Sequence, residues 1–325
     1  MEKKLHSCIV VNPKFRKNVS LSKKDVKERY KIMYSETFQT SVPGTAAIVI
    51  DQIKDIIKNK TVLDLGCGAG RLSLFAAKYA NHVTGIDYID TAINYATKFS
   101  EMCKIKNVDF QVADIDKFGG KKFDVILISE VFQHVDQPLE TLKKCKKLLN
   151  KNGLIIINIP AFNNFRGNVW LTLQNLFNLP MSLTDTYQIS FSEMKTMTKK
   201  AKLELTQTIG FSYDWALDEW GIEDLKRRIF LATKDGKLDK FANFKSINSW
   251  LDSSLEQNKE FLAYLLKQKI IKTRSKNNIL KIPKNASKEI RKYLDDGNQN
   301  VNRYYCTLEP FNKMGAGAIY IIKTK

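Results

Sequence analysis

Three glycines at alternate positions mark the segment whose residues most clearly suggest chemistry. Gly66, Gly68 and Gly70 follow an apolar run and precede a segment of helical pattern. Such glycines let the backbone turn sharply and approach a ligand, and the helix after them offers free N–H groups. Arg71 stands where a dinucleotide-binding turn has its third glycine. Asp64, two residues before the first glycine, suits a cationic amino group and would repel a pyrophosphate. The segment therefore predicts a binding turn for a ligand other than a dinucleotide.

A second acidic residue ends the next apolar run. Asp87 follows Val83–Ile86 and lies about 20 residues after the glycine turn, where a carboxylate can accept both hydroxyls of a ribose. Tyr88 could pack beside the base of the same ligand or serve only the packing of its loop. The two carboxylates together predict a site for a nucleoside that carries a positive charge.

The segment Val62–Gly70 resembles the first motif of class I S-adenosylmethionine (SAM)-dependent methyltransferases, and the resemblance extends over residues 44–213. It implies that the three glycines line the methionine portion of SAM and that Asp64 serves the amino group directly or through water. It also implies that Asp114 binds the adenine amino group and that Ile115 supports the ring. Capping of a turn is the alternative role of Asp114. The implied cofactor-binding residues are Asp64, Gly66, Cys67, Gly68, Gly70, Asp87, Tyr88, Asp114, Ile115 and Ser129.

A glutamate and a histidine four residues apart are the candidate catalytic pair. The segment 124–135 resembles the part that follows the fourth strand in methyltransferases of the ubiquinone/menaquinone-biosynthesis type. On a helical turn this spacing would put Glu130 and His134 on one face. Methyl transfer to a hydroxyl requires loss of its proton, which histidine can accept near neutral pH. We predict His134 as the general base, with Glu130 orienting it or the substrate. In the alternative, the histidine only holds the loop near the cofactor.

The elements that position these residues alternate between strands and helices. The patterns predict strands at Thr61–Leu65, His82–Asp87, Val108–Ala113, Asp124–Ser129, Gly153–Ile159, Glu204–Tyr213 and Gly317–Lys323. They predict helices at Asp25–Thr37, Gly44–Lys58, Arg71–Tyr79, Thr91–Cys103, Pro138–Leu149 and Ser192–Lys200. Alternation of this kind indicates an α/β fold. We expect a Rossmann-like, doubly wound, seven-stranded and mostly parallel sheet, with a helical insertion before the last strand.

Four regions follow from this pattern. Residues 1–43 form a basic N-terminal segment and cap, and residues 44–215 form the SAM-binding core. Residues 216–308 are predicted to be a mainly helical insertion that could cap the substrate. Residues 309–325 would return to the core as a final strand beside Glu204–Tyr213.

The net charge of +19 is concentrated in the two flanks. Residues 1–60 carry about +7 and residues 221–325 about +11, which leaves the middle almost neutral. Basic flanks could attract nucleic acid, an anionic membrane surface or a phosphorylated substrate, or they could be simply solvated.

Cysteine and histidine usage argues against disulfides and metal. The five cysteines contain no Cys-x-x-Cys pair, and the chain has three histidines, so we expect reduced thiols, no metal site and a cytoplasmic protein. No apolar run approaches the roughly 20 residues of a membrane span. The oligomeric state stays open.

These observations favour methyl transfer to an oxygen or nitrogen of a small-molecule acceptor. An RNA methyltransferase that uses the basic flanks and a non-catalytic SAM-binding or interaction protein are the alternatives. Methylation of exocyclic amino groups of bases is disfavoured, because Ser129-Glu130-Val131-Phe132 replaces the Asp/Asn-Pro-Pro-Tyr/Phe pattern of those enzymes. A nicotinamide oxidoreductase is disfavoured by the glycine spacing.

Overall fold

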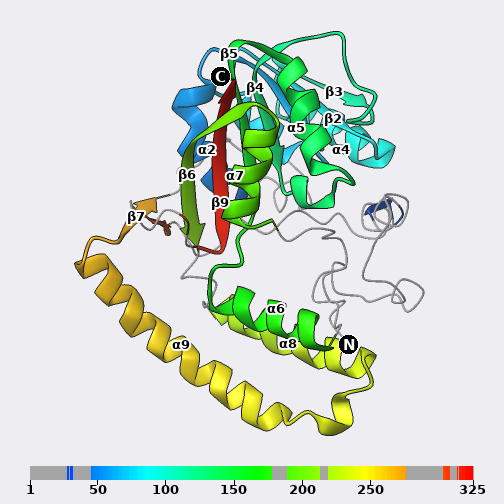
Figure 1. The fold of residues 1–325 in the computed structure, drawn as a ribbon. Helices are drawn as coiled ribbons and strands as arrows, with labels where there is room; N and C mark the ends of the chain where they lie inside the picture. The colour runs from blue at the N-terminus through cyan, green and yellow to red at the C-terminus, as the bar shows by residue number, and fades with distance from the viewer. Residues whose placement is uncertain are drawn as a thin grey trace.

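The computed structural model describes residues 28, 30, 31, 45–177, 189–212, 219–275, 303–307, 313 and 315–324. Within them, one sheet of nine strands has the order β3-β2-β1-β4-β5-β9-β6-β8-β7 (Figure 1). The strands are β1 (Thr61–Leu65), β2 (His82–Asp87), β3 (Val108–Val112), β4 (Phe123–Ser129), β5 (Leu149–Pro160), β6 (Leu203–Ser212), β7 (Ile271–Ser275), β8 (Arg303–Thr307) and β9 (Gly317–Thr324).

The first five strands are parallel, and β9 lies antiparallel between β5 and β6. The expected α/β, Rossmann-like and mostly parallel fold is therefore confirmed, and so is the pairing of the last strand beside β6. The expected count of seven strands is wrong, because β8 and β7 extend the sheet beyond β6.

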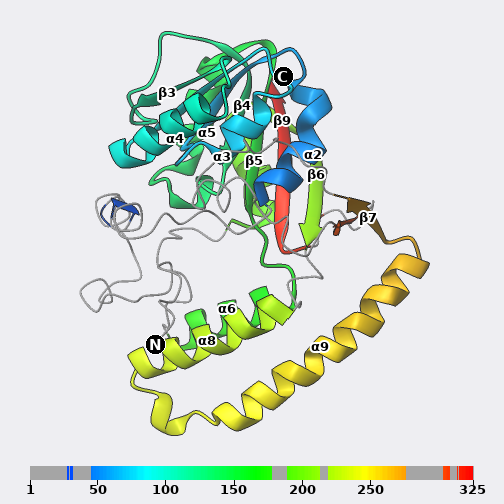
Figure 2. The same ribbon diagram turned by 180° about the vertical axis from the view of Figure 1, so that it is seen from behind.

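Helices cover both faces of the sheet, so it is doubly wound (Figures 1 and 2). The covering helices are α2 (Thr45–Ile57), α3 (Arg71–Ala76), α4 (Asp90–Met102), α5 (Pro138–Lys147) and α7 (Phe191–Lys200). Side chains alternate along each strand between two cores. Val62 and Ile156 pack with α2 and α3 on one face, whereas Leu63 and Ile157 pack with α5 and α7 on the other. This alternation fixes the register and thereby the place where each strand ends.

A separate helical layer lies below the sheet in Figure 1. It consists of α6 (Phe165–Phe177), α8 (Glu219–Asp235), the short 3₁₀ helix η5 (Asp239–Phe241) and α9 (Phe244–Lys267). Helices α6 and α8 lie side by side, and α9 leads back to β7 at the edge of the sheet (Figures 1 and 2). The layer has its own apolar cluster, in which Trp170, Leu225 and Leu251 are buried.

Residues 216–308 contain strands as well as the predicted helices. Their described part contains α8, η5 and α9 but also β7 and β8. Ile271-Lys-Thr-Arg-Ser has a single apolar residue, so its strand arises from pairing with β8 and leaves little pattern in the sequence. The four-region division of the chain stays a prediction.

Some predicted features lie outside the described residues. Of the predicted helix Asp25–Thr37, Glu28, Tyr30 and Lys31 are described, and all three are helical. Cys8 lies outside the described residues, and the four cysteines inside them are free thiols. Among the helices of the described residues, none has the length and apolar character that crossing a bilayer requires.

One buried carboxylate joins α6 to α8. Asp224 is 3% exposed and accepts from Arg166 Nη2 at 2.6 Å, Arg227 Nη2 at 2.9 Å and Arg228 Nε at 2.7 Å. Burial alone would raise the pKa of Asp224, but Arg228 and Arg166 outweigh it and lower that pKa. Arg166 and Arg228 also lie over the ring of Trp170. Asp224 therefore organises three cations that would otherwise repel one another.

We expect Asp224→Ala to destabilise the chain by about 3–5 kcal/mol, because it leaves partly buried guanidinium groups without their carboxylate. Chemical denaturation would measure the loss. Glu256→Ala is the control, since Glu256 and Lys259 form an exposed pair whose removal should leave stability nearly unchanged. Equal effects of the two substitutions would contradict this role of Asp224.

Candidate functional site

The order of the strands reverses at β1. Strands β2 and β3 lie on one side of β1, and β4 and β5 lie on the other. The segments that follow β1 and β4 therefore leave the sheet side by side at its carboxyl edge, where open α/β sheets bind their ligands. The predicted site residues after β1, β2, β3 and β4 all lie at this edge.

The glycine turn connects β1 to α3 with an unusual backbone. Gly66, Gly68 and Gly70 have φ values of +71°, +52° and +80°, in the left-handed region. The N–H groups of Gly66 and Cys67 both donate to the Ile86 carbonyl, at 2.8 and 2.9 Å. These bonds fasten the turn to β2 and thereby direct it across the carboxyl edge.

Two glycines allow close contacts that a side chain would block. A Cβ at Gly66 would lie 2.5 Å from Val131 Cγ2. At Gly70 it would lie 2.7 Å from Phe110 Cζ, on β3. Hence the turn after β1 packs directly against both the segment after β4 and the side of β3.

The carboxylate of Asp64 lies beneath the turn. It is 1% exposed and accepts from Ser73 Oγ at 2.5 Å, a bond that ties β1 to α3. Burial raises the pKa of Asp64 to about 7, and the nearby charge of Asp87 adds to this effect. The same surroundings raise the pKa of the Cys67 thiol, mainly through burial. Asp64 therefore stabilises the glycine turn by joining β1, before the turn, to α3, after it.

Asp87 lies at the end of β2, where it is partly exposed. Its Oδ2 accepts from the Gly68 N–H at 2.9 Å, and its Oδ1 accepts from the Ile89 N–H at 2.9 Å. One carboxylate thus orders both the glycine turn and the start of α4.

Tyr88 and Asp114 lie beside Asp87. Burial raises the pKa of Tyr88, and the charges of Asp87 and Asp114 raise it further. Asp114 Oδ1 accepts from the Asp116 N–H at 2.9 Å, so the residue does cap a turn. Ile115 is half-buried and packs against the core on the α5 side. The structure thus brings together the acids at the carboxyl ends of β1 and β2 and just beyond β3.

The segment after β4 differs from the expected helical turn. Glu130 has a left-handed φ of +56°, and the 3₁₀ helix η3 (Phe132–His134) begins only two residues later. Glu130 and His134 therefore do not share one helical face, and that expectation is wrong. Asn158 Nδ2 donates to Ser129 Oγ and to Glu130 Oε1, both at 3.0 Å. Hydrogen bonds from Asn158 of β5 therefore fix the start of the segment that follows β4.

His134 contacts a residue that the sequence patterns did not single out. Its Nε2 lies 3.1 Å from Tyr30 Oη, and the two rings meet edge to face at 5.7 Å between centroids. Because Val131 packs on Gly66 and its carbonyl accepts from the His134 N–H at 2.8 Å, the His134 turn adjoins the glycine turn. Tyr30 lies in a helical segment that carries no motif, 104 positions before His134. No pattern near either residue in the sequence could therefore predict this contact.

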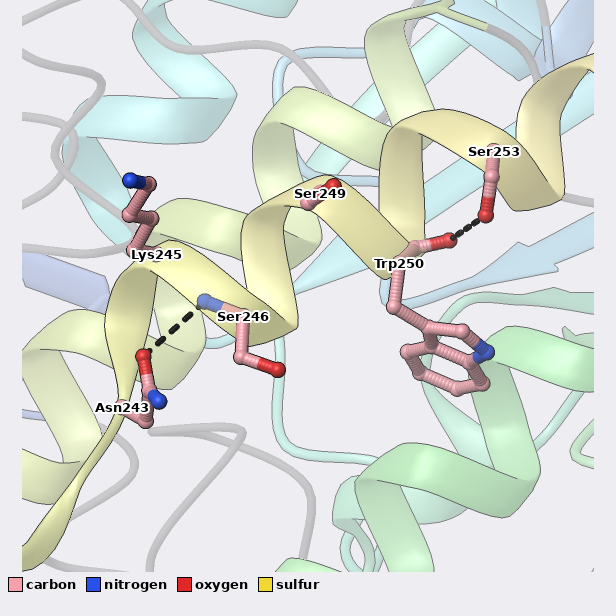
Figure 3. Close-up of a pocket in the computed structure, with 6 residues that line it drawn as sticks. All are labelled: Asn243, Lys245, Ser246, Ser249, Trp250 and Ser253. Carbon is pink, nitrogen blue, oxygen red and sulfur yellow. Dashed lines mark hydrogen bonds between the residues drawn. The ribbon is translucent and has the colours of Figure 1, made fainter.

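A shallow hollow on α9 is a distinct feature. Figure 3 shows the six residues that line it, Asn243, Lys245, Ser246, Ser249, Trp250 and Ser253. The Trp250 ring packs against Phe165 of α6 at 5.1 Å between centroids. Asn243 caps α9 by accepting from the Ser246 N–H at 3.0 Å. The six side chains include neither a carboxylate nor an imidazole, unlike those beside the glycine turn.

The chain is similar in sequence to known methyltransferases. The family model described as "Methyltransferase domain" matches residues 56–214. Ubiquinone biosynthesis O-methyltransferase of Coxiella burnetii is 30% identical over 179 residues, which cover 53% of this chain and 74% of that protein. (S)-tetrahydroprotoberberine N-methyltransferase of Eschscholzia californica is 36% identical over 120 residues, or 36% of this chain and 33% of that one. The solved structure of the YcgJ protein of Bacillus subtilis covers 86% of this chain and 97% of its own, with 16% identity and a TM-score of 0.47.

We expect the buried Asp64 to make stability fall as pH rises from about 4 to about 7. In this window the folded chain holds a proton on Asp64 that the unfolded chain has lost, so rising pH favours unfolding. Replacing Asp64 by Asn should remove this dependence, with a gain on the order of 4 kcal/mol above pH 7. Denaturant titrations of both proteins between pH 4 and pH 8 would measure it.

Asp124→Asn, on β4, is the matched control. Partial burial raises the pKa of Asp124, but hydrogen bonds from Thr61 and Asn150 outweigh burial and lower it. Asp124 therefore contributes stability above its unfolded pKa that is lost as pH falls, so this variant should lose stability at neutral pH. A difference between Asp64→Asn and the unaltered chain that stays constant with pH would contradict the assignment.

Proposed function

The chain belongs to the class I SAM-dependent methyltransferases, and we propose that it transfers the methyl group of SAM to an oxygen or nitrogen atom of a small-molecule acceptor. The observation that carries the proposal is the packing of the His134 turn against the glycine turn, through Val131 and Gly66. A proton acceptor beside the cofactor turn is what transfer to a hydroxyl or an ammonium group requires.

The residues of the carboxyl edge fit SAM. Asp87 and Asp114 bring negative charge to the site, which suits a sulfonium nucleoside with an amino group and opposes a phosphate. Asp64, whose pKa burial raises to about 7, adds to this charge as it loses its proton. Two backbone N–H groups already orient the Asp87 carboxylate. Because the side chain is ordered before a ribose binds, binding loses little further side-chain entropy. We expect the glycine turn with Cys67 to hold the methionine portion, and Tyr88, Ile115 and Ser129 to flank the nucleoside. When bound, SAM supplies an electrophilic methyl group.

His134 takes the proton of the acceptor in this proposal. A Tyr30 hydroxyl that donates to Nε2 selects the tautomer in which Nε2 is the basic nitrogen. An acceptor hydroxyl or ammonium group that takes the place of the Tyr30 hydroxyl would then lose its proton to Nε2. Glu130 contributes a fixed negative charge on the same segment.

The helical layer is the proposed cover of the acceptor. Support comes from its attachment at the carboxyl edge, where the Ala161 N–H donates to the Ala316 carbonyl at 2.9 Å. Asn164 Nδ2 donates to the Gly315 carbonyl at 2.8 Å, just before α6 begins. A cover at this edge would exclude water and hold the acceptor in line with the methyl group.

The experiment that tests the function is a screen for S-adenosylhomocysteine release. The purified chain is incubated with SAM and with pools of small hydroxylated and amino compounds, and separately with total RNA. We expect release with a small-molecule pool and none with RNA. Release with RNA alone, falling steeply with salt, would support an RNA methyltransferase that uses the basic flanks. SAM binding without release from any pool would support a non-catalytic protein.

Asp87→Ala should weaken SAM binding by about 1.5–3 kcal/mol, the scale of a charge-assisted hydrogen bond. The substitution removes both the proposed ribose contact and the anchor of Gly68. Isothermal calorimetry would measure it, with Asp109→Ala as control, because Asp109 bonds His82 and Thr84 on the same sheet, away from the turn. Unchanged affinity in Asp87→Ala would refute the assignment.

His134→Ala should slow turnover by about 100-fold or more if His134 is the base. Tyr30→Phe removes only the hydroxyl that the acceptor displaces from Nε2 in this proposal, so it should change turnover by no more than roughly 10-fold in either direction. Neither change should alter SAM affinity, which calorimetry can check. Full turnover in His134→Ala with the acceptor from the screen would leave His134 only its role in holding the loop.

A further inference from the structure

We propose that Asn158 of β5 is a positioning residue, which fixes Glu130 and thereby the turn that carries His134. The inference rests on the proposed function, because it assigns Asn158 to the proton-accepting side of that site. It concerns how the turn is held and does not place Asn158 in contact with SAM or the acceptor.

The contacts of Asn158 converge on Ser129, the last residue of β4, and on Glu130, the first residue beyond it. In the register of the sheet, Asn158 lies beside Ser129. Its Nδ2 donates to Ser129 Oγ and to Glu130 Oε1, each at 3.0 Å, and its backbone carbonyl accepts from the Glu130 N–H at 2.9 Å. One residue of β5 therefore holds both the backbone and the side chain of Glu130.

The hydrogen bonds from Asn158 offset an unfavourable backbone conformation at Glu130. A left-handed φ, +56° here, costs a residue with a side chain roughly 1–2 kcal/mol. This conformation turns the chain away from β4 and into η3, which ends at His134. Loss of the Asn158 contacts would free Glu130 to return to an extended conformation and would move His134 away from Tyr30.

The position of Asn158 is unfavourable for stability alone. It is 1% exposed and interrupts an apolar strand, Leu154-Ile-Ile-Ile-Asn-Ile159. Gln133, 4% exposed, donates through Nε2 to the second oxygen of Glu130, at 3.4 Å. Within the described residues, neither Asn158 Oδ1 nor Gln133 Oε1 has a hydrogen-bond partner. Buried acceptors without a partner cost stability. The placement of Glu130 therefore explains this network better than a contribution to stability does.

A matched residue allows the test. Asn150, also on β5, donates through Nδ2 to Asp124 Oδ1 at 2.9 Å, at the opposite end of the strand. Asn158→Asp and Asn150→Asp each replace an amide donor with a second carboxylate next to the first. The two variants make the same chemical change, but only Asn158→Asp acts on the His134 turn.

The main readout is the titration of the His134 imidazole, followed by NMR. The chain has three histidines, and His134→Ala identifies the signal. In Asn158→Asp we expect the His134 midpoint to move by on the order of 0.5 pH unit or more, as loss of one hydrogen-bonded contact would cause. In Asn150→Asp it should stay in place. Turnover with the acceptor from the screen should fall at least tenfold in Asn158→Asp alone, with SAM affinity unchanged.

Exchange of the two groups provides the rescue. Combining Asn158→Asp with Glu130→Gln restores one amide and one carboxylate with their roles reversed, and the His134 midpoint should return toward its original value. If Asn158→Asp fails to fold, Asn158→Ser and Asn150→Ser are compared instead. The His134 midpoint should again move in the Asn158 variant and stay in place in the Asn150 variant.

Identical His134 midpoints in the Asn158 and Asn150 variants would overturn the inference, and so would a failed rescue. The titration needs no acceptor. An unsuccessful acceptor screen would therefore count against the proposed function alone, and an unmoved His134 signal would count against the positioning role alone.

Discussion

The site depends on how closely the segments after β1 and β4 approach each other. Gly66 has no Cβ, and this absence allows Val131 to pack on the turn at a distance that any side chain would prevent. The contact joins two functions at one edge of the sheet. Asp87 orders the turn after β1 through the Gly68 N–H, and the turn after β4 carries His134 next to it, since the Val131 carbonyl accepts from the His134 N–H.

The sequence predicted most of the sheet at whose carboxyl edge the candidate site lies. β1, β2 and β4 are short, mostly buried strands that alternate with helices along the chain, so their place in a parallel sheet is encoded locally. The acids at 64, 87 and 114 lie at or just beyond the carboxyl ends of strands that meet at one edge, which makes their proximity a consequence of topology.

What the sequence could not predict depends on distant contacts. Tyr30 meets His134 across 104 positions, and β7 is a basic segment that becomes a strand only beside β8. The spacing of Glu130 and His134 suggested a helix, but hydrogen bonds from Asn158 stabilise a left-handed Glu130 instead. In each case a partner far along the chain outweighs local preference.

The place of β9 has a consequence for biosynthesis. β9 fills the gap between β5 and β6, although more than 100 residues separate it from either strand. Until residues 317–324 leave the ribosome, β5 presents an open edge rich in isoleucine, and β6 presents one with threonine, isoleucine and phenylalanine. Open edges of this kind are surfaces on which nascent chains associate. Chaperone protection of the emerging chain would thus matter most during synthesis of the helical layer.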